Sequence, residues 1–241
     1  MKIEIWSDFV CPFCYIGKRR LELALDKFEY KDEVELIFRS FELDPSAQKK
    51  YDDNIHQLIA KKYGIPVEQA KASNDQLIDQ AKTLRLEYNF DTLIPTNTFD
   101  AHRLSHYGKA EGKMNELSER LLKAYFTDSL DLSNHEILAK LAGEVGLDSK
   151  KALEILSTDQ YSLEVRKDEE RASALRISGV PFFVFNNKYA VSGAQSPDLF
   201  LDVLKKVRNE ELSSPSIEFL TKKLDEEDSN SNTCSDGKCE V

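Results

Sequence analysis

The sequence predicts an α/β fold in which a small sheet is interrupted by a large all-helical insertion domain. Runs rich in β-forming residues occur only towards the two ends of the chain, at Lys2–Trp6, Val34–Phe41, Pro181–Phe185 and Tyr189–Ser192. The interval from about Ser46 to Arg176 carries helical patterns and no convincing strand. A pair of cysteines with two residues between them follows the first strand directly.

Composition and charge describe an ordinary soluble protein. The chain has 241 residues, of which 41% are hydrophobic and 32% are charged. The formal net charge of −10 argues against a general affinity for nucleic acid or for anionic membranes. No apolar run approaches the ~20 residues that a membrane span needs. The first residues, MKIEIWSDF, lack the apolar segment of a signal peptide, so we expect a cytoplasmic protein without nucleic-acid or membrane partners.

The first elements predict a β-α-β unit. An amphipathic helix is expected over Tyr15–Tyr30, where Leu21, Leu25 and Phe28 share one face. The strand before this helix and the strand after it are therefore expected to be parallel and joined by a right-handed crossover.

The central part of the chain predicts a series of helices. The charge run Lys167–Arg171 is interpreted as a solvated helix face. His102 and His106, four residues apart, are interpreted as one core and one surface histidine rather than as a metal pair, and we expect no resident metal. The expected helices are Asn54–Tyr63, Pro66–Tyr88, Asn97–Glu111, Lys113–Asp128, Ser133–Val145, Ser149–Ser157 and Tyr161–Arg176.

The last elements predict a β-hairpin turning at Asn186–Lys188, followed by a helix from Pro197 to about Arg208. The resulting order is β-α-β, helical insert, β-β-α, which is the arrangement of a thioredoxin fold with a helical domain inserted in its middle. We predict a thioredoxin-fold N-terminal part at 1–45, a helical insertion at 46–171, a thioredoxin-fold C-terminal part at 172–210 and an acidic flexible tail at 211–241.

The CPFC stretch carries the strongest chemical signal. The strand-to-helix turn places Cys11 at a helix N-terminus, where unpaired N–H groups and the helix dipole stabilise a thiolate. Pro12 suits the first helical turn. Cys14 lies about one turn further on and is the natural resolving thiol, which attacks a mixed disulfide formed on Cys11.

A second half of the site is expected at Val180–Pro181. In a thioredoxin arrangement, the proline that opens the strand opposite the cysteines is cis, and the Val180 backbone is then free to pair with a substrate strand. The alternative is an ordinary trans proline at a strand start. Val180, Pro12 and Phe13 are the candidate substrate contacts, beside Cys11, Cys14 and Pro181.

Two further cysteines, Cys234 and Cys239, form a Cx4C pair in the tail. One hypothesis is an auxiliary redox pair that exchanges electrons with Cys11–Cys14, and the alternative is a passive tail. The four thiols could instead bind zinc, although Cx4C at the end of a linker is a weak zinc pattern.

Three segments resemble the DsbA superfamily, in particular its FrnE-like branch. They are IEIWSDFVCPFCYIGKRRLE, NTFDAHRL and SGVPFFVFNNKYAVSGAQSPDLF. The resemblance covers about residues 1 to 208. It implies a thioredoxin fold, a cytoplasmic setting, Cys11 as nucleophile, Cys14 as resolving cysteine and Pro181 as cis-proline. Phe13 stands where strongly oxidising members have histidine, which favours reduction or isomerisation.

A sister branch contains 2-hydroxychromene-2-carboxylate isomerases and kappa-class glutathione transferases, which typically carry serine in place of the first active-site cysteine.

The sequence therefore predicts a thiol–disulfide oxidoreductase or isomerase that acts on protein or small-molecule thiols and disulfides. No bound cofactor is expected, and glutathione is a candidate co-substrate. The alternatives are a glutathione-dependent small-molecule isomerase or transferase and a redox- or zinc-regulated binding protein. The oligomeric state, monomer or dimer, stays open.

Overall fold

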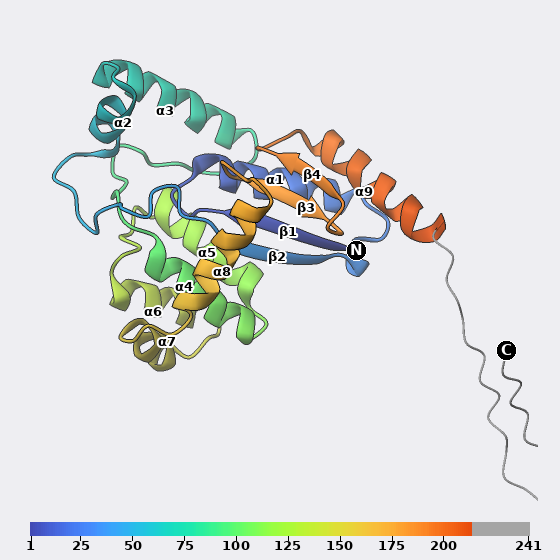
Figure 1. The fold of residues 1–241 in the computed structure, drawn as a ribbon. Coiled ribbons are helices and arrows are strands. Elements are labelled where there is room, and N and C mark those ends of the chain that lie inside the picture. The colour runs from blue at the N-terminus through green and yellow to red at the C-terminus, as the bar shows by residue number, and fades with distance from the viewer. Residues whose placement is uncertain (214–241) are drawn as a thin grey trace, which may run out of the picture.

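A computed structural model describes residues 1–213, which form a four-stranded mixed sheet with helices on both faces (Figure 1). The strand order is β2-β1-β3-β4. β1 runs parallel to β2, whereas β1 with β3 and β3 with β4 are antiparallel. The strands are β1 (Lys2–Ser7), β2 (Glu35–Ser40), β3 (Phe182–Phe185) and β4 (Tyr189–Ser192).

The helices include a group of seven, α2 to α8, that lies between β2 and β3 in the chain. Within residues 1–213, no helix combines the length and the apolar character needed to cross a membrane. The helices are α1 (Pro12–Asp26), α2 (Ile55–Tyr63), α3 (Val67–Lys82), α4 (Phe99–Ala110), α5 (Met114–Phe126), α6 (His135–Glu144), α7 (Ser149–Leu156), α8 (Ser162–Ala174) and α9 (Pro197–Ser213), with a 3-10 turn at Lys31–Glu33.

The two faces of the sheet follow the alternation of side chains along each strand. Ile3 and Ile5 of β1 pack in one core with residues of α1 and α9, such as Leu21 and Leu204. Trp6, of the opposite parity, packs on the other face with residues of α8 and its C-terminal end. Because successive strand side chains point to opposite faces, this period of two explains how one short sheet is covered on both sides.

The helical insertion has its own large core, to which Tyr15 and Ile16 of α1 also belong. The α/β thioredoxin arrangement with a large helical insertion is therefore confirmed, as is the parallel pairing of the first two strands. The exact domain limits at residues 45, 171 and 210 stay a prediction.

Several helix boundaries differ from the expected ones, and two of these differences have a clear local cause. α1 begins at Pro12 rather than at Tyr15, because Pro12 occupies the first helical position directly after Cys11. α3 ends at Lys82 rather than at Tyr88. Arg85 then adopts a positive φ of 58°, and Tyr88 enters the insertion core from an extended segment.

A buried charged cluster fastens α8 to the sheet. Arg39 of β2 bonds Glu4 of β1 and also Asp168 of α8, with Nη2–Oε1 and Nη1–Oδ1 distances of 2.6 and 2.8 Å. Arg171 reaches Glu4 from α8 at 2.6 Å, and the Trp6 indole donates to the Asp168 carbonyl. The interpretation of Lys167–Arg171 as a solvated face was thus wrong for Asp168, which is buried, whereas Lys167 and Glu170 are exposed.

Burial by itself would raise the pKa of both carboxyl groups in this cluster. For Asp168, hydrogen bonds from His106 and from the Ser40 N–H, with the charge of Arg39, outweigh burial and lower its pKa below the ordinary value. For Glu4, Arg171 and Arg39 do the same. Both groups are therefore carboxylates at neutral pH, and their charges are compensated.

We predict that Asp168→Ala destabilises the protein by about 3 kcal/mol at pH 7, because Arg39 then keeps only Glu4 as an ion-pair partner and the Ser40 N–H loses its buried acceptor. Since the folded-state pKa of Asp168 is lowered, its contribution is present above the unfolded pKa of about 3.9 and is lost as the pH falls through the lower folded value. Urea unfolding at pH 7 and at lower pH measures both effects, with Glu164→Ala on the same helix as control. Equal stabilities of wild type and Asp168→Ala at pH 7 would contradict the role of this cluster.

Candidate functional site

The CPFC motif occupies the turn between β1 and α1. Cys11 is the N-cap residue of α1, with φ −90° and ψ 112°, and Pro12 begins the helix. No acidic residue lies in the first helical turn, so no carboxylate competes with the Cys11 sulfur for the positive end of the helix dipole. The Cys14 N–H bonds to the Cys11 carbonyl at 3.0 Å and closes the turn.

Cys14 is the inner thiol of the pair. Its exposed fraction is 2%, against 4% for Cys11, and both are free thiols. The Asp8 N–H donates to the Cys14 sulfur at 3.5 Å. Burial, followed by the hydrogen bond and repulsion from Cys11, raises the pKa of Cys14 well above its ordinary value, although Ser7 and Asp8 oppose this. Cys14 is thus held as a protonated thiol at neutral pH, which suits a sulfur that reacts second.

The Val180–Pro181 segment lies against the motif. Its peptide bond is cis, as predicted. The Cys11 sulfhydryl donates to the Val180 carbonyl at 3.5 Å, although 169 positions separate the two residues in sequence. The Pro181 carbonyl accepts from the Gly193 N–H at 2.8 Å, which ties the segment to the end of β4.

The structure therefore brings together Cys11, Cys14, Val180 and Pro181. Phe13 has an exposed fraction of 45% and is open to solvent beside them. Pro12 is half-buried. The predicted auxiliary pair, Cys234 and Cys239, lies outside the described residues.

Sequence reasoning missed the role of Asp8, which joins three parts of the site. Its backbone N–H bonds Cys14, and its carbonyl accepts from the Cys11 N–H at 3.2 Å. Its carboxylate accepts from the Leu43 N–H at 2.8 Å and lies 3.3 Å from His102 Nε2. The available signal was its position, a lone acid between a strand and a cysteine motif.

His102 brings the insertion to the site from α4. It is 2% exposed, pairs with Asp8 and lies against the Phe9 ring. His106 is also buried and contacts Ser40, so the expectation of one surface histidine was wrong. Among residues 1–213, no group of three or more His, Cys, Asp or Glu side chains is placed to hold a metal.

Tyr88, also from the insertion, contacts the motif itself. Its hydroxyl donates to the Pro12 carbonyl at 2.7 Å, and its ring stacks on Tyr15 and Phe126. Burial, followed by repulsion from Tyr15 and the two cysteines, raises the pKa of Tyr88, so the hydroxyl stays a donor at neutral pH. The sequence gives no signal for this contact, because Tyr88 reads as part of a helix.

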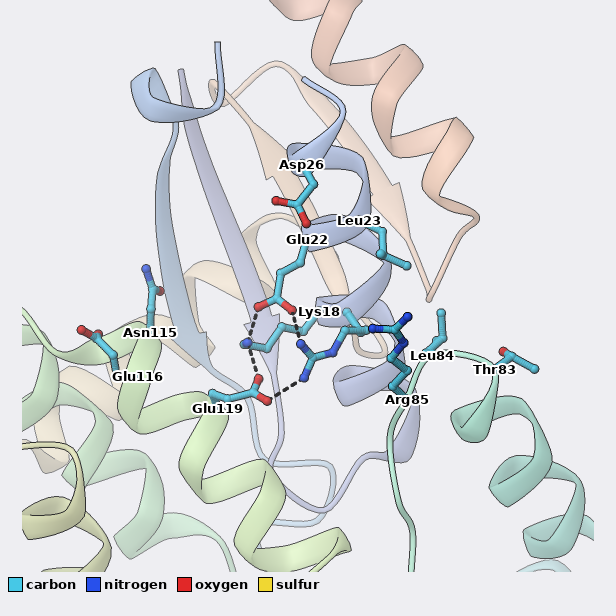
Figure 2. Close-up of a pocket in the computed structure, with 11 residues that line it drawn as sticks. Lys18, Glu22, Leu23, Asp26, Thr83, Leu84, Arg85, Asn115, Glu116 and Glu119 are labelled. Atoms are coloured by element: carbon cyan, nitrogen blue, oxygen red, sulfur yellow. Dashed lines mark hydrogen bonds and ion pairs between the residues drawn. The ribbon is translucent and has the colours of Figure 1, made fainter. Parts of the chain in front are cut away.

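A charged cluster anchors α1 to α5 beside an open groove of about 990 Å³, shown in Figure 2. Glu119 of α5 accepts from Arg19 at 2.7 Å and also from Lys18, and Lys18 and Arg19 both pair with Glu22. The Tyr15 hydroxyl donates to Glu119 at 2.7 Å. Burial would raise the pKa of Glu119, but Lys18, Tyr15 and Arg19 outweigh it and lower that pKa, so the pairs stay charged.

These contacts define what the site can do chemically. An outer thiol lies at a helix N-terminus, an inner protonated thiol lies behind it, and a backbone carbonyl lies beside the outer sulfur. Such an arrangement fits a dithiol that reacts with disulfides in two steps.

Comparison with known proteins places this chain in a family. A family model for the DSBA-like thioredoxin domain matches residues 2–205. The protein YwbO of Bacillus subtilis, which is described as uncharacterized, is 30% identical over 203 residues, 82% of this chain and 92% of YwbO. The crystal structure of a probable DsbA oxidoreductase from Streptomyces coelicolor is 37% identical, with a TM-score of 0.84 over 91% of this chain and 94% of that chain.

Two more distant structures share the fold. A 2-hydroxychromene-2-carboxylate isomerase is 15% identical, with a TM-score of 0.66 over 89% of this chain and all of its own. The cytosolic disulfide reductase DsbM of Pseudomonas aeruginosa is 12% identical, with a TM-score of 0.62 over 88% of this chain and all of its own, and it has also been solved with GSH. With the family model covering most of its length and a 30% identical relative, the chain belongs to the DSBA-like thioredoxin domain family.

Proposed function

We propose that this protein is a thiol–disulfide oxidoreductase with isomerase or reductase character that acts through Cys11 and Cys14. The observation that carries the proposal is the placement of Cys11 at the N-cap of α1, with the buried Cys14 behind it and the Val180 carbonyl beside it. An inert structural cysteine pair would also be buried, but it would need neither the N-cap position nor the neighbouring Val180 carbonyl.

In the first step, the Cys11 thiolate attacks one sulfur of a substrate disulfide. The substrate S–S bond breaks, a Cys11–substrate disulfide forms, and the departing substrate sulfur takes up a proton from water. In the second step, Cys14 gives up its proton to solvent and attacks the Cys11 sulfur, which releases the second substrate thiol. The Cys11–Cys14 disulfide forms as the substrate gains two electrons, and two external thiols then reduce the enzyme.

Isomerisation uses the same first step without net electron transfer. The released substrate thiolate exchanges with another disulfide of the substrate, and the thiolate freed there attacks the substrate sulfur of the mixed disulfide. A new substrate disulfide forms, and the Cys11 thiolate is expelled unchanged. Phe13 supports this reducing or isomerising character, since a phenyl ring has no hydrogen bond to offer a thiolate.

Glutathione is the co-substrate that we propose for re-reduction, with no bound cofactor. The GSH complex of DsbM, a fold relative, supports it. The cytosolic description of DsbM also supports our proposal that the chain works in the reducing cytoplasm.

We predict that wild-type protein reactivates a scrambled-disulfide test protein in a glutathione buffer and that Cys11→Ser abolishes this activity. Cys14→Ser is expected to keep part of the shuffling but to lose net reduction, because only reduction needs the resolving thiol. If wild type is inert while both thiols are reduced, or if Cys11→Ser retains full activity, the proposed chemistry is wrong.

A second candidate is glutathione-dependent isomerisation or transfer on a small molecule, which the shared fold with 2-hydroxychromene-2-carboxylate isomerase brings into consideration. The Cys14→Ser variant separates the two, because activation of glutathione does not require a resolving thiol.

The hydroxyl of Tyr88 gives a second test of the site. We predict that Tyr88→Phe lowers kcat/KM for disulfide reduction about fivefold, because the lost bond to the Pro12 carbonyl is worth about 1 kcal/mol and frees the first turn of α1. The matched control is Tyr189→Phe on β4, which removes a hydroxyl bond to Glu210 of α9 and should leave turnover unchanged. Equal turnover of Tyr88→Phe and wild type would show that the motif does not need this anchor.

We also propose that Cys234 and Cys239 exchange electrons with Cys11 and Cys14. A tethered pair would do so at a raised effective concentration. The Cys234→Ser/Cys239→Ser variant is then expected to be re-reduced several-fold more slowly, measured with glutathione and with a protein dithiol as reductants. Unchanged rates with both reductants would exclude the exchange.

A further inference from the structure

Gly17, in the middle of α1, is a residue whose identity is not explained by the helix or by the proposed chemistry. A glycine inside a helix costs about 1 kcal/mol relative to alanine. Gly17 is buried and lies one turn beyond Cys14. An alanine there would suit the helix better, so a constraint outside the helix selects glycine.

The constraint is the Val180–Pro181 segment. A Cβ added at Gly17 would lie 2.9 Å from Cγ of Pro181, 3.2 Å from Cζ of Phe183 and 3.5 Å from Cα of Ala194. The first distance is shorter than real Cβ contacts, so α1 or the Pro181 segment would have to move.

None of these neighbours can give way easily. The Pro181 ring can change only its pucker, and the Pro181 carbonyl is held by the Gly193 N–H. Phe183 is fully buried in the sheet core. The Ala194 contact is backbone, and the Ala194 carbonyl is bonded to α1 by Arg20. A side chain at position 17 would therefore widen the gap between α1 and the Pro181 segment.

The same gap sets the position of the Val180 carbonyl relative to the Cys11 sulfur, now 3.5 Å apart. We propose that Gly17 is a positioning residue, which lets the substrate-pairing backbone at Val180 approach the cysteines closely enough for a bound peptide disulfide to reach Cys11. This inference rests on the proposed disulfide chemistry and adds a determinant of peptide recognition to it.

The test compares two reactions of Gly17→Ala. Reduction of a peptide disulfide needs both Cys11 and the Val180 backbone, whereas alkylation of reduced Cys11 by iodoacetamide needs the sulfur alone. We expect kcat/KM for the peptide to fall about tenfold, mainly through KM, while the alkylation rate stays within about twofold of wild type.

Gly108→Ala is the matched control. Gly108 is also a buried glycine within a helix, and its added Cβ would meet Cδ2 of the buried Leu117 at 2.8 Å, a clash of similar size that does not involve the Pro181 segment. This variant should leave both rates unchanged. If Gly17→Ala matches wild type in peptide turnover, or if it lowers both rates in the same proportion, the positioning role is overturned.

A double variant covers the case in which Gly17→Ala does not fold. Pro181→Ala removes the ring that the new Cβ would strike, so Gly17→Ala should destabilise the Pro181→Ala background less than it destabilises wild type, as measured by urea unfolding. An equal loss of stability in both backgrounds would show that Pro181 is not the relevant contact. A wild-type protein that is inert towards the peptide disulfide would instead count against the proposed function.

Discussion

The site depends on Asp8, the residue at which β1 turns into the cysteine motif. Its backbone holds Cys11 and Cys14 from one side, and its carboxylate binds the Leu43 N–H and lies next to His102. A buried carboxylate without such partners would be strongly unfavourable. Asp8 therefore connects three segments: the cysteine motif, the chain that follows β2 and helix α4 of the insertion.

Residues of the helical insertion hold the cysteine helix α1 in place. Tyr88 holds the Pro12 carbonyl, and Glu119 binds Tyr15 and Arg19 of the same helix. On the sheet face that carries Trp6, Asp168 and Arg171 of α8 fix the insertion to the sheet through Arg39 and Glu4. α1 is thus held from the insertion on one side and by Pro181 and Ala194 on the other.

The order of elements and the proline opposite the cysteines could be predicted because they have strong local signals, namely strand alternation, a CxxC pair after a strand and a Gly-Val-Pro strand start. The tertiary partners could not. Lys167–Arg171 looks solvated in sequence because charge density is a local property, whereas the burial of Asp168 is set by Arg39, far away in the chain. Tyr88 was assigned to a helix because the positive φ at Arg85 has no clear sequence mark.

The pairing of β1 with β3 has a consequence for how the protein is made. Ile3 lies opposite Phe185, so the central strand pair closes only after the whole insertion has been synthesised. The entropic cost of closing a loop grows slowly with its length, by about 0.6 kcal/mol per doubling. The long stretch of sequence between β1 and β3 therefore slows the formation of this strand pair more than it reduces its stability. During translation, Cys11 and Cys14 therefore leave the ribosome long before Val180 and Pro181 exist to cover them. In the nascent chain, the reactive thiols are therefore exposed before the Val180–Pro181 segment that contacts them has been synthesised.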